Sequence, residues 1–305
     1  MDYAYFEGNI IPVEQANLNI KTNSIHYGTI VFEGIRTYYN EEHKQLYILF
    51  SNEHYARLLK NAKAMFMNLN KTPEELTEIT KEILRKSEIR EDTYIRPFVY
   101  FKDLALTPKL KDFTPEIAIY TYKFGRYLDT SKGIHAKVSS WKRNPDNSIP
   151  SRWKVAGAYV NSALAKTEAL MSGYDEAILL NEQGNIAEGS GENIFIIRGK
   201  KLITPSFSEG ILEGITRRAI IKLAKNELFL EVEERSIARS ELYMADEVFL
   251  TGTAAEITPV IMIDNRPIGD GNIGPITQKL QKLYFDAVRG NVERYRHWLT
   301  PVYDT

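Results

Sequence analysis

Residues 151–157 read Ser-Arg-Trp-Lys-Val-Ala-Gly, so Lys154 lies between an aromatic side chain and small apolar residues that lead into a predicted helix. Burial disfavours the charged form of an amine and lowers its pKa from about 10.4. The positive end of the following helix would lower this pKa further. Lys154 is therefore a candidate nucleophile, although an ordinary surface lysine is the alternative interpretation.

A carboxylate flanked by glycines follows Lys154 along the chain. Residues 187–193 read Ala-Glu-Gly-Ser-Gly-Glu-Asn, and Glu188 is the second of them. Schiff-base chemistry on pyridoxal phosphate (PLP) requires an amine that attacks an aldehyde and a carboxylate that keeps a pyridine nitrogen protonated. A solvated turn carboxylate is the alternative interpretation of Glu188, and neither residue proves this chemistry alone.

Two further segments are candidates for binding a phosphate. Residues 210–218, Gly-Ile-Leu-Glu-Gly-Ile-Thr-Arg-Arg, place Gly214 directly before a predicted helix. Free N–H groups at a helix start and the Thr216 hydroxyl make a good anion cradle. Residues 250–256, Leu-Thr-Gly-Thr-Ala-Ala-Glu, run from a strand into a turn of small residues that could bind an oxyanion. A simple helix cap and a simple turn are the respective alternatives.

The composition indicates a globular protein with a small ligand. A length of 305 residues, with 43% hydrophobic and 26% charged residues, favours two domains with ordinary cores. A formal net charge of -1 provides no broad basic field for nucleic acid or an anionic membrane. The absence of cysteine excludes disulfides, Cys-ligated zinc and a thiol nucleophile.

Other signals that would point to a different class are missing. The chain has no H-E-x-x-H, G-x-S-x-G or Walker A motif, and its five histidines are scattered, so we expect no metal. Each histidine is interpreted as a surface or packing residue. The start of the chain has no signal pattern and no apolar stretch is long enough to span a membrane, which predicts a cytoplasmic location.

The apolar pattern predicts a smaller α/β domain at residues 1–123, a linker at 124–133 and a larger domain at 134–305. The smaller domain has a helix capped by Ser51 whose apolar face extends to Leu69, with Arg57 beside that face. A second helix begins with Thr72 as its cap and Pro73 in its first turn. The predicted strands of this domain are 94–101 and 116–123. The larger domain has predicted strands at 134–141, 176–181, 193–198, 247–251 and 260–264, and helices at about 157–172, 215–227 and 276–288.

One glycine motif suggests a rival function. Residues 269–274, Gly-Asp-Gly-Asn-Ile-Gly, fit the G-x-G-x-x-G fingerprint of dinucleotide-binding proteins. However, Asn265, Arg266 and Pro267 separate the preceding strand from the glycines, and no second parallel strand follows. A non-catalytic nucleotide-binding module is therefore the alternative from another functional class.

Together these residues resemble the fold-type IV PLP enzymes, and most closely the branched-chain amino acid aminotransferases. The matching segments span nearly the whole chain in the family's order. They are residues 26–28, 31–36, 94–97, 138–141, Lys154 with Tyr159, and residues 188–195, 214–217 and 245–259. The resemblance implies an α/β fold of the α+β type, in two domains with the cofactor in the interdomain cleft.

The resemblance also implies a role for each cofactor-binding residue. Lys154 would hold PLP covalently and, once released, move a proton between substrate and cofactor. Tyr159 would hydrogen-bond the phenolic oxygen of PLP, and Glu188 would pair with its ring nitrogen. The phosphate would be held by four residues, namely Arg57, Ile215, Thr216 and Thr253.

For the substrate, the resemblance implies transamination between leucine, isoleucine or valine and 2-oxoglutarate. Tyr94 and the turn at Thr253 and Ala254 would bind the substrate carboxylate, and Arg96 would bind the distal carboxylate of glutamate. The side-chain pocket would be lined by Tyr27, Phe32 and Tyr127, for which core packing or a linker anchor is the alternative. The family also implies a homodimer or a higher homo-oligomer.

Two departures from the family pattern concern substrate range. Phe124 stands where relatives often have tryptophan, and residues 104–108, Leu-Ala-Leu-Thr-Pro, replace a glycine-rich loop. They do not concern the chemistry. The alternatives within the same fold are a D-amino acid transaminase, an (R)-amine transaminase or an aminodeoxychorismate lyase, and residues 94–96 and the turn at 252–259 favour the branched-chain interpretation over them.

Overall fold

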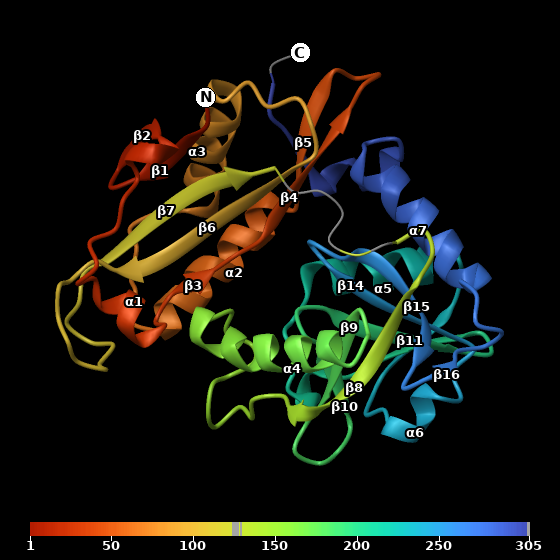
Figure 1. Cartoon of the computed structure of the whole chain (residues 1–305). Coiled ribbons are helices and arrows are strands. Elements are labelled where there is room, and N and C mark those ends of the chain that lie inside the picture. Colours follow the sequence, from red (N-terminus) through yellow and green to blue (C-terminus); the bar gives the residue numbers. More distant parts are fainter. Residues whose placement is uncertain (124–127, 129, 304–305) are drawn as a thin grey trace. The chain divides into compact units, whose positions relative to one another are not determined.

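The computed structural model describes residues 1–123, 128 and 130–303, which form two compact units (Figure 1). The first unit comprises residues 1–125, 154–157 and 286–305, and the second comprises residues 126–153 and 158–285. The predicted boundaries differ from this division, because they assign the C-terminal residues and the segment around Lys154 to the second domain. Of the predicted linker, residues 124–127 and 129 lie outside the described residues.

An antiparallel sheet forms the framework of the first unit. Among the described residues it has eight strands, in the order β17-β5-β4-β6-β7-β1-β2 with β3 paired to β6. Its strands are β1 (Tyr3–Phe6), β2 (Asn9–Pro12), β3 (Val31–Phe32), β4 (Ile35–Asn40), β5 (Gln45–Leu49), β6 (Thr93–Phe101), β7 (Pro115–Tyr122) and β17 (Leu299–Pro301). The C-terminal residues belong to this unit because β17 pairs with β5, with Leu299 opposite Leu49.

The helices of the first unit are α1 (Asn23–Tyr27), α2 (Ser51–Ala64) and α3 (Pro73–Lys86), with 3-10 turns η1 (Val13–Gln15) and η4 (Glu293–Trp298). Helices α2 and α3 pack against each other and contact the sheet (Figure 1). The predicted start of α3 is confirmed, because Thr72 and Glu75 form a reciprocal capping box.

The predicted limits of α2 are wrong at both ends. Ser51 is the first helical residue rather than the cap, and its Oγ lies 2.7 Å from Thr77 Oγ1 of α3. The helix ends at Ala64 and not near Leu69, because the chain turns at Phe66, which has a φ of 61°.

The second unit contains a mixed sheet. Among the described residues it has nine strands, in the order β10-β9-β8-β15-β14-β11-β12-β13 with β16 paired to β15. Its strands are β8 (Ile134–Lys142), β9 (Glu176–Leu180), β10 (Ile186–Gly189), β11 (Asn193–Arg198), β12 (Lys201–Thr204), β13 (Glu231–Glu234), β14 (Glu247–Gly252), β15 (Glu256–Ile263) and β16 (Arg266–Pro267). Strand β8 runs parallel to both β9 and β15, and β12 runs parallel to β13.

The remaining helical elements are α4 (Tyr159–Met171), α5 (Ile215–Glu227), α6 (Arg239–Leu242) and α7 (Pro275–Val288), with 3-10 turns η2 (Ala156–Ala158) and η3 (Phe207–Glu209). The predicted limits of α5 are confirmed. In the second unit α4 contacts β8 and β9 (Figure 1), whereas α5 contacts β13 and β14. The main core of this unit consists of aliphatic residues such as Ile178, Ile194, Leu250 and Ile263, none of which has exposed surface.

The glycine motif at residues 269–274 serves the packing of α7. Glu247 of β14 accepts hydrogen bonds from the N–H groups of Ile276 (3.0 Å) and Thr277 (2.7 Å) and from the Thr277 hydroxyl (2.7 Å). A Cβ on Gly274 would overlap the Glu247 carboxyl group. The first turn of α7 therefore already holds a protein carboxylate, where a dinucleotide-binding motif would hold a phosphate.

Replacing Glu247 with alanine should destabilise the protein by about 1–3 kcal/mol, because buried N–H groups at the start of α7 would lose their acceptor. The measurement is the midpoint of thermal unfolding, with exposed Glu293→Ala as the matched control. An unchanged midpoint for Glu247→Ala would contradict this account of the helix start.

Candidate active site

Backbone pairing fixes the position of Lys154 in the first unit. Residues 154–157 run antiparallel to residues 28–32, with Val155 opposite Val31. Three hydrogen bonds join the two segments: Phe32 N–H to Lys154 O (3.0 Å), Ala156 N–H to Ile30 O (2.8 Å) and Gly157 N–H to Gly28 O (3.1 Å). A segment far along the chain is thereby held beside β3, and its lysine side chain is half-buried.

The Phe32 ring is the meeting point of two predicted site residues. Lys154 Nζ lies 5.0 Å from its centroid, and the Arg96 guanidinium carbon lies 4.5 Å from it. Arg96 also donates a hydrogen bond of 3.0 Å from Nη2 to the Tyr94 hydroxyl. A Cβ on Gly34 would overlap that hydroxyl, so residue 34 must be glycine for Tyr94 to take this position. The first unit thus brings together an amine, a guanidinium, a phenol and an apolar ring.

A buried ion network surrounds Arg57. Glu33, which has no exposed surface, accepts hydrogen bonds from Arg57 Nε (2.6 Å) and Nη2 (2.9 Å), and its Oε2 lies 2.8 Å from His54 Nδ1. Burial alone would raise the pKa of Glu33, but the Arg57 guanidinium and His54 hold it well below its usual range. Burial lowers the pKa of His54, against the pull of Glu33. Glu33 is therefore ionised and His54 neutral at neutral pH.

Sequence reasoning did not identify this network. Glu33 lies in the matching segment 31–36 but receives no role from the sequence, and His54 is expected to be a surface or packing residue. The structure agrees with the packing interpretation, because His54 is buried, and it adds that the ring bonds the buried Glu33 carboxylate. The available signal was the i, i+3 spacing of His54 and Arg57 on α2 and one acidic residue within an apolar stretch.

The other tyrosines of the prediction have different positions. Tyr27 ends α1 and is 37% exposed, whereas Tyr159 begins α4 in the second unit and is partly buried. Tyr127 lies outside the described residues.

In the second unit, three nitrogen groups surround the buried Glu188 carboxylate. Arg143 Nε lies 2.8 Å from Glu188 Oε1. Glu188 Oε2 accepts hydrogen bonds from Asn193 Nδ2 (3.0 Å) and from the Leu212 N–H (3.1 Å). The strand carrying Glu188 changes register against β9 just before this residue. The carboxylate is therefore fixed by its surroundings, as an acceptor for a ligand nitrogen needs to be.

Asn193 links Glu188 to the two candidate phosphate segments. Its Nδ2 also donates to Leu212 O (3.0 Å), and a Cβ on Gly214 would overlap its Oδ1. Asn193 pairs with Thr251 across β11 and β14. The start of α5, with Ile215 and Thr216, and the turn after β14, with Thr253 and Ala254, therefore lie near the Glu188 carboxylate. Sequence reasoning gave no role to Asn193 or Arg143.

A second buried carboxyl lies close to Glu188. Glu192 accepts a hydrogen bond of 3.0 Å from the Gly191 N–H, and burial together with the charge of Glu176 raises its pKa to about 8. Glu176 itself is fully buried and pairs with Lys166 Nζ at 2.6 Å. Glu192 is therefore protonated at neutral pH.

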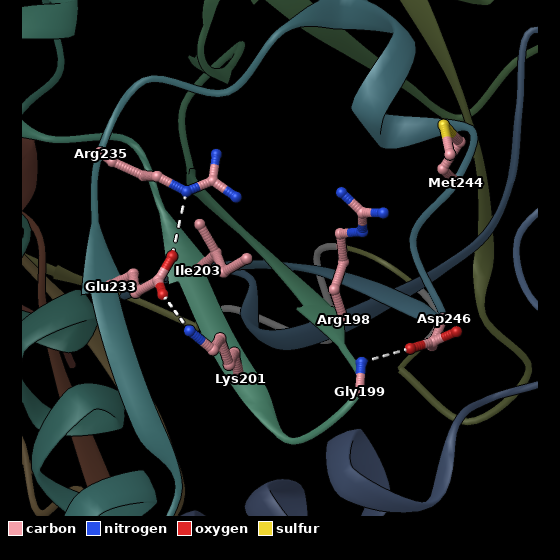
Figure 2. Close-up of a pocket in the computed structure, with 8 residues that line it drawn as sticks. All are labelled: Arg198, Gly199, Lys201, Ile203, Glu233, Arg235, Met244 and Asp246. Carbon is pink, nitrogen blue, oxygen red and sulfur yellow. Dashed lines mark hydrogen bonds and ion pairs between the residues drawn. The ribbon is translucent and has the colours of Figure 1, made fainter.

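A separate pocket of about 460 Å³ in the second unit contains no predicted site residue (Figure 2). Its cations are already paired: Lys201 lies 2.6 Å and Arg235 3.1 Å from Glu233, and Arg198 lies 3.1 Å from Glu241. These ion pairs connect β11 and β12 to β13 and α6.

Within the part of the chain that the structure describes, none of the helices has the length and hydrophobicity that a membrane-spanning helix needs.

Residues 30–263 match the model of the family described as amino-transferase class IV. The chain belongs to the class IV aminotransferases. The resemblance seen in the sequence is confirmed, as are the transferase class and the α/β fold of this family.

Relatives of this class IV aminotransferase match over almost the entire chain. A protein of Aquifex aeolicus (strain VF5), named probable branched-chain-amino-acid aminotransferase, is 76% identical over 304 residues, which are 100% of this chain and 98% of the relative. The branched-chain aminotransferase of Thermoproteus uzoniensis, solved with norvaline, is 43% identical with a TM-score of 0.95, covering 99% of each chain.

A third relative is the branched-chain amino acid aminotransferase of Thermobaculum terrenum, whose structure was solved in the PLP-bound holo form. It is 40% identical with a TM-score of 0.95, and the match covers 99% of each chain. A protein with nearly the same fold therefore holds PLP.

The Glu192→Gln variant should be more stable than the parent at pH 8. The protonated Glu192 contributes stability that is complete below the ordinary glutamate pKa and is lost as pH rises to about 8. A glutamine cannot ionise, so its gain should grow from pH 5 to pH 8 by at least about 1 kcal/mol. Thermal unfolding at both pH values measures this, with exposed Glu182→Gln as control. A difference that does not change with pH would contradict the buried acid.

Proposed function

We propose that this chain transfers amino groups between leucine, isoleucine or valine and 2-oxoglutarate, giving branched-chain 2-oxo acids and L-glutamate, with PLP as its cofactor. The observation that carries the proposal is the cluster at Phe32, where the Lys154 amine and the Arg96 guanidinium lie against one apolar ring. The names of the most similar relatives support the same substrates.

The residues present fit PLP. The first unit supplies the Lys154 amine and Arg57, whose orientation is fixed by Glu33. The second unit supplies an oriented carboxylate, a phenol and a helix start. Glu188 would bind the ring nitrogen, and Tyr159 would bind the phenolic oxygen. The phosphate would be bound by Arg57 and by the N–H groups and hydroxyls of Ile215, Thr216 and Thr253.

When bound, PLP supplies a protonated ring that withdraws electrons from the substrate carbon. The Glu188 carboxylate, held in place by Asn193, Leu212 and Arg143, would keep the proton at the ring nitrogen through its negative charge. The Lys154 Nζ would take the proton from the substrate carbon and pass it to the cofactor.

Arg96 explains how one pocket could accept two kinds of substrate. Its Nε is buried and has no hydrogen-bond partner among the described residues, while its other contacts are the Phe32 ring and the Tyr94 hydroxyl. A buried donor without an acceptor is costly, so a glutamate carboxylate arriving there would be bound strongly. The rest of the proposed lining is Tyr27, Phe32 and Tyr127 for an aliphatic side chain, and Tyr94, Thr253 and Ala254 for the substrate carboxylate.

The alternatives within the fold are separated by their substrates. Half-reactions with L-leucine, D-alanine and a chiral aryl amine distinguish the transaminases, and pyruvate release from aminodeoxychorismate would reveal the lyase. The nucleotide-binding alternative loses its basis, because Glu247 fills the helix start that a nucleotide phosphate would need.

We also propose that the protein is a cytoplasmic homodimer or higher homo-oligomer. An apolar stripe on α4, formed by Val160, Leu164 and Met171 with nearby Trp141, is exposed in the single chain and supports self-association.

The Lys154→Ala variant should lose the absorbance band of bound PLP near the edge of the visible range, and its turnover of L-leucine with 2-oxoglutarate should fall at least about 100-fold. Exposed Lys200→Ala is the matched control and should keep both. If the purified parent has no such band, or if Lys154→Ala keeps it, the proposed cofactor role is wrong.

Replacing Arg96 with methionine should lower kcat/KM for L-glutamate about 10- to 100-fold, the effect expected when a charged hydrogen bond of about 1.5–3 kcal/mol is lost. The leucine half-reaction should change far less, because its side chain has no carboxylate. Single-turnover rates with each amino acid measure the difference, with exposed Arg294→Met as control. An equal loss for both amino acids would rule out a selective role of Arg96.

A further inference from the structure

The proposed reaction gives no role to Glu33, although a buried carboxylate is expensive to retain. Glu33 lies between β3 and β4, and its backbone N–H donates to Pro97 O (2.9 Å). Its side chain has no exposed surface, so solvent does not stabilise its charge. The charge is stabilised by two residues of α2, Arg57 and His54.

The geometry of these contacts restricts the Arg57 guanidinium. Glu33 binds it through two atoms, Nε and Nη2, one to each carboxylate oxygen. A two-point contact of this kind fixes the plane of the guanidinium as well as its position. His54 is three residues before Arg57 on α2 and bonds Oε2, so rotation of the carboxylate would break a third contact.

The protonation states of Glu33, His54 and Arg57 stabilise the contacts between them. Glu33 stays ionised because of Arg57 and His54, and burial keeps His54 neutral. A neutral imidazole that bonds a carboxylate through Nδ1 must carry its proton on that atom. The Arg57 guanidinium is therefore held by the ionised Glu33 carboxylate, and that carboxylate accepts a hydrogen bond from the neutral His54 ring.

We propose that Glu33 is a positioning residue that holds the Arg57 guanidinium in the orientation needed to bind the phosphate group of the cofactor, and that His54 holds Glu33. This inference rests on the proposed function, in which Arg57 is a phosphate ligand. A long arginine side chain that is fixed before binding loses less conformational freedom when the phosphate arrives, and affinity rises accordingly.

The test compares PLP with pyridoxal, which lacks the phosphate. Dissociation constants of both are measured by absorbance on the cofactor-free parent, Glu33→Gln and His54→Gln. Glu33→Gln should weaken PLP binding about 10-fold or more, leave pyridoxal binding nearly unchanged, and so lower the preference for PLP. His54→Gln should lower the same preference by a smaller factor. Exposed Glu82→Gln, on α3 of the same unit, is the control and should keep the parent's preference.

A double-mutant cycle of Glu33→Gln and Arg57→Gln gives a result even if the single Glu33 variant does not fold. Glu33→Gln leaves the Arg57 charge without its buried partner, whereas Glu33→Gln with Arg57→Gln removes both charges together. In the Arg57→Gln background, Glu33→Gln should not change the preference for PLP any further. If the single Glu33 variant is unfolded, the His54 variant and the double variant provide the result.

Each unfavourable outcome has a distinct meaning. An equal loss of PLP and pyridoxal affinity in the Glu33 variant, or additive effects in the double variant, would overturn the positioning role and leave the proposed function intact. An unchanged preference in Arg57→Gln would overturn it too, because Arg57 would not bind the phosphate. A parent protein that binds neither compound through Lys154 would overturn the proposed function itself.

Discussion

The backbone pairing of residues 154–157 with residues 28–32 is the constraint on which the chemistry of the first unit depends. Gly28 adopts a left-handed conformation with a φ of 64°, and a Cβ there would come within 3.0 Å of Gly157 Cα. Two glycines in contact therefore let the two backbones approach closely enough to bond. The position of Lys154 follows from the paired main chain of residues 154–157, and its amine lies 5.0 Å from the centroid of the Phe32 ring.

In the second unit a single side chain, that of Asn193, fixes the positions of several groups. The amide of Asn193 reaches the Glu188 carboxylate and the Leu212 carbonyl, while Gly214 leaves room for its oxygen. The proposed contacts of the cofactor ring and of the phosphate are thereby fixed relative to each other. In each unit a buried polar group with satisfied hydrogen bonds orients a residue that would face the ligand.

The sequence predicted those features that depend on neighbours along the chain. The limits of α5 follow from Gly214 and a clear apolar period, and the start of α3 follows from the Thr72 capping box. The start of α2 could not be predicted, because it depends on a contact with α3. The same is true of the supporting residues: Glu33 acts through α2, and Arg143 acts on Glu188 from a distant position. The sequence therefore indicates the residues that would contact the cofactor, but not the residues that orient them.

The pairing of strand β17 has a consequence for how the first unit folds. It completes the edge of the first sheet beside β5, and Phe50 N–H bonds Trp298 O at 2.7 Å just before it. Leu299 and Leu49, which it brings together, are far apart in sequence, and contacts of that kind form slowly. Until β17 pairs with it, β5 is an unprotected strand edge of the first sheet.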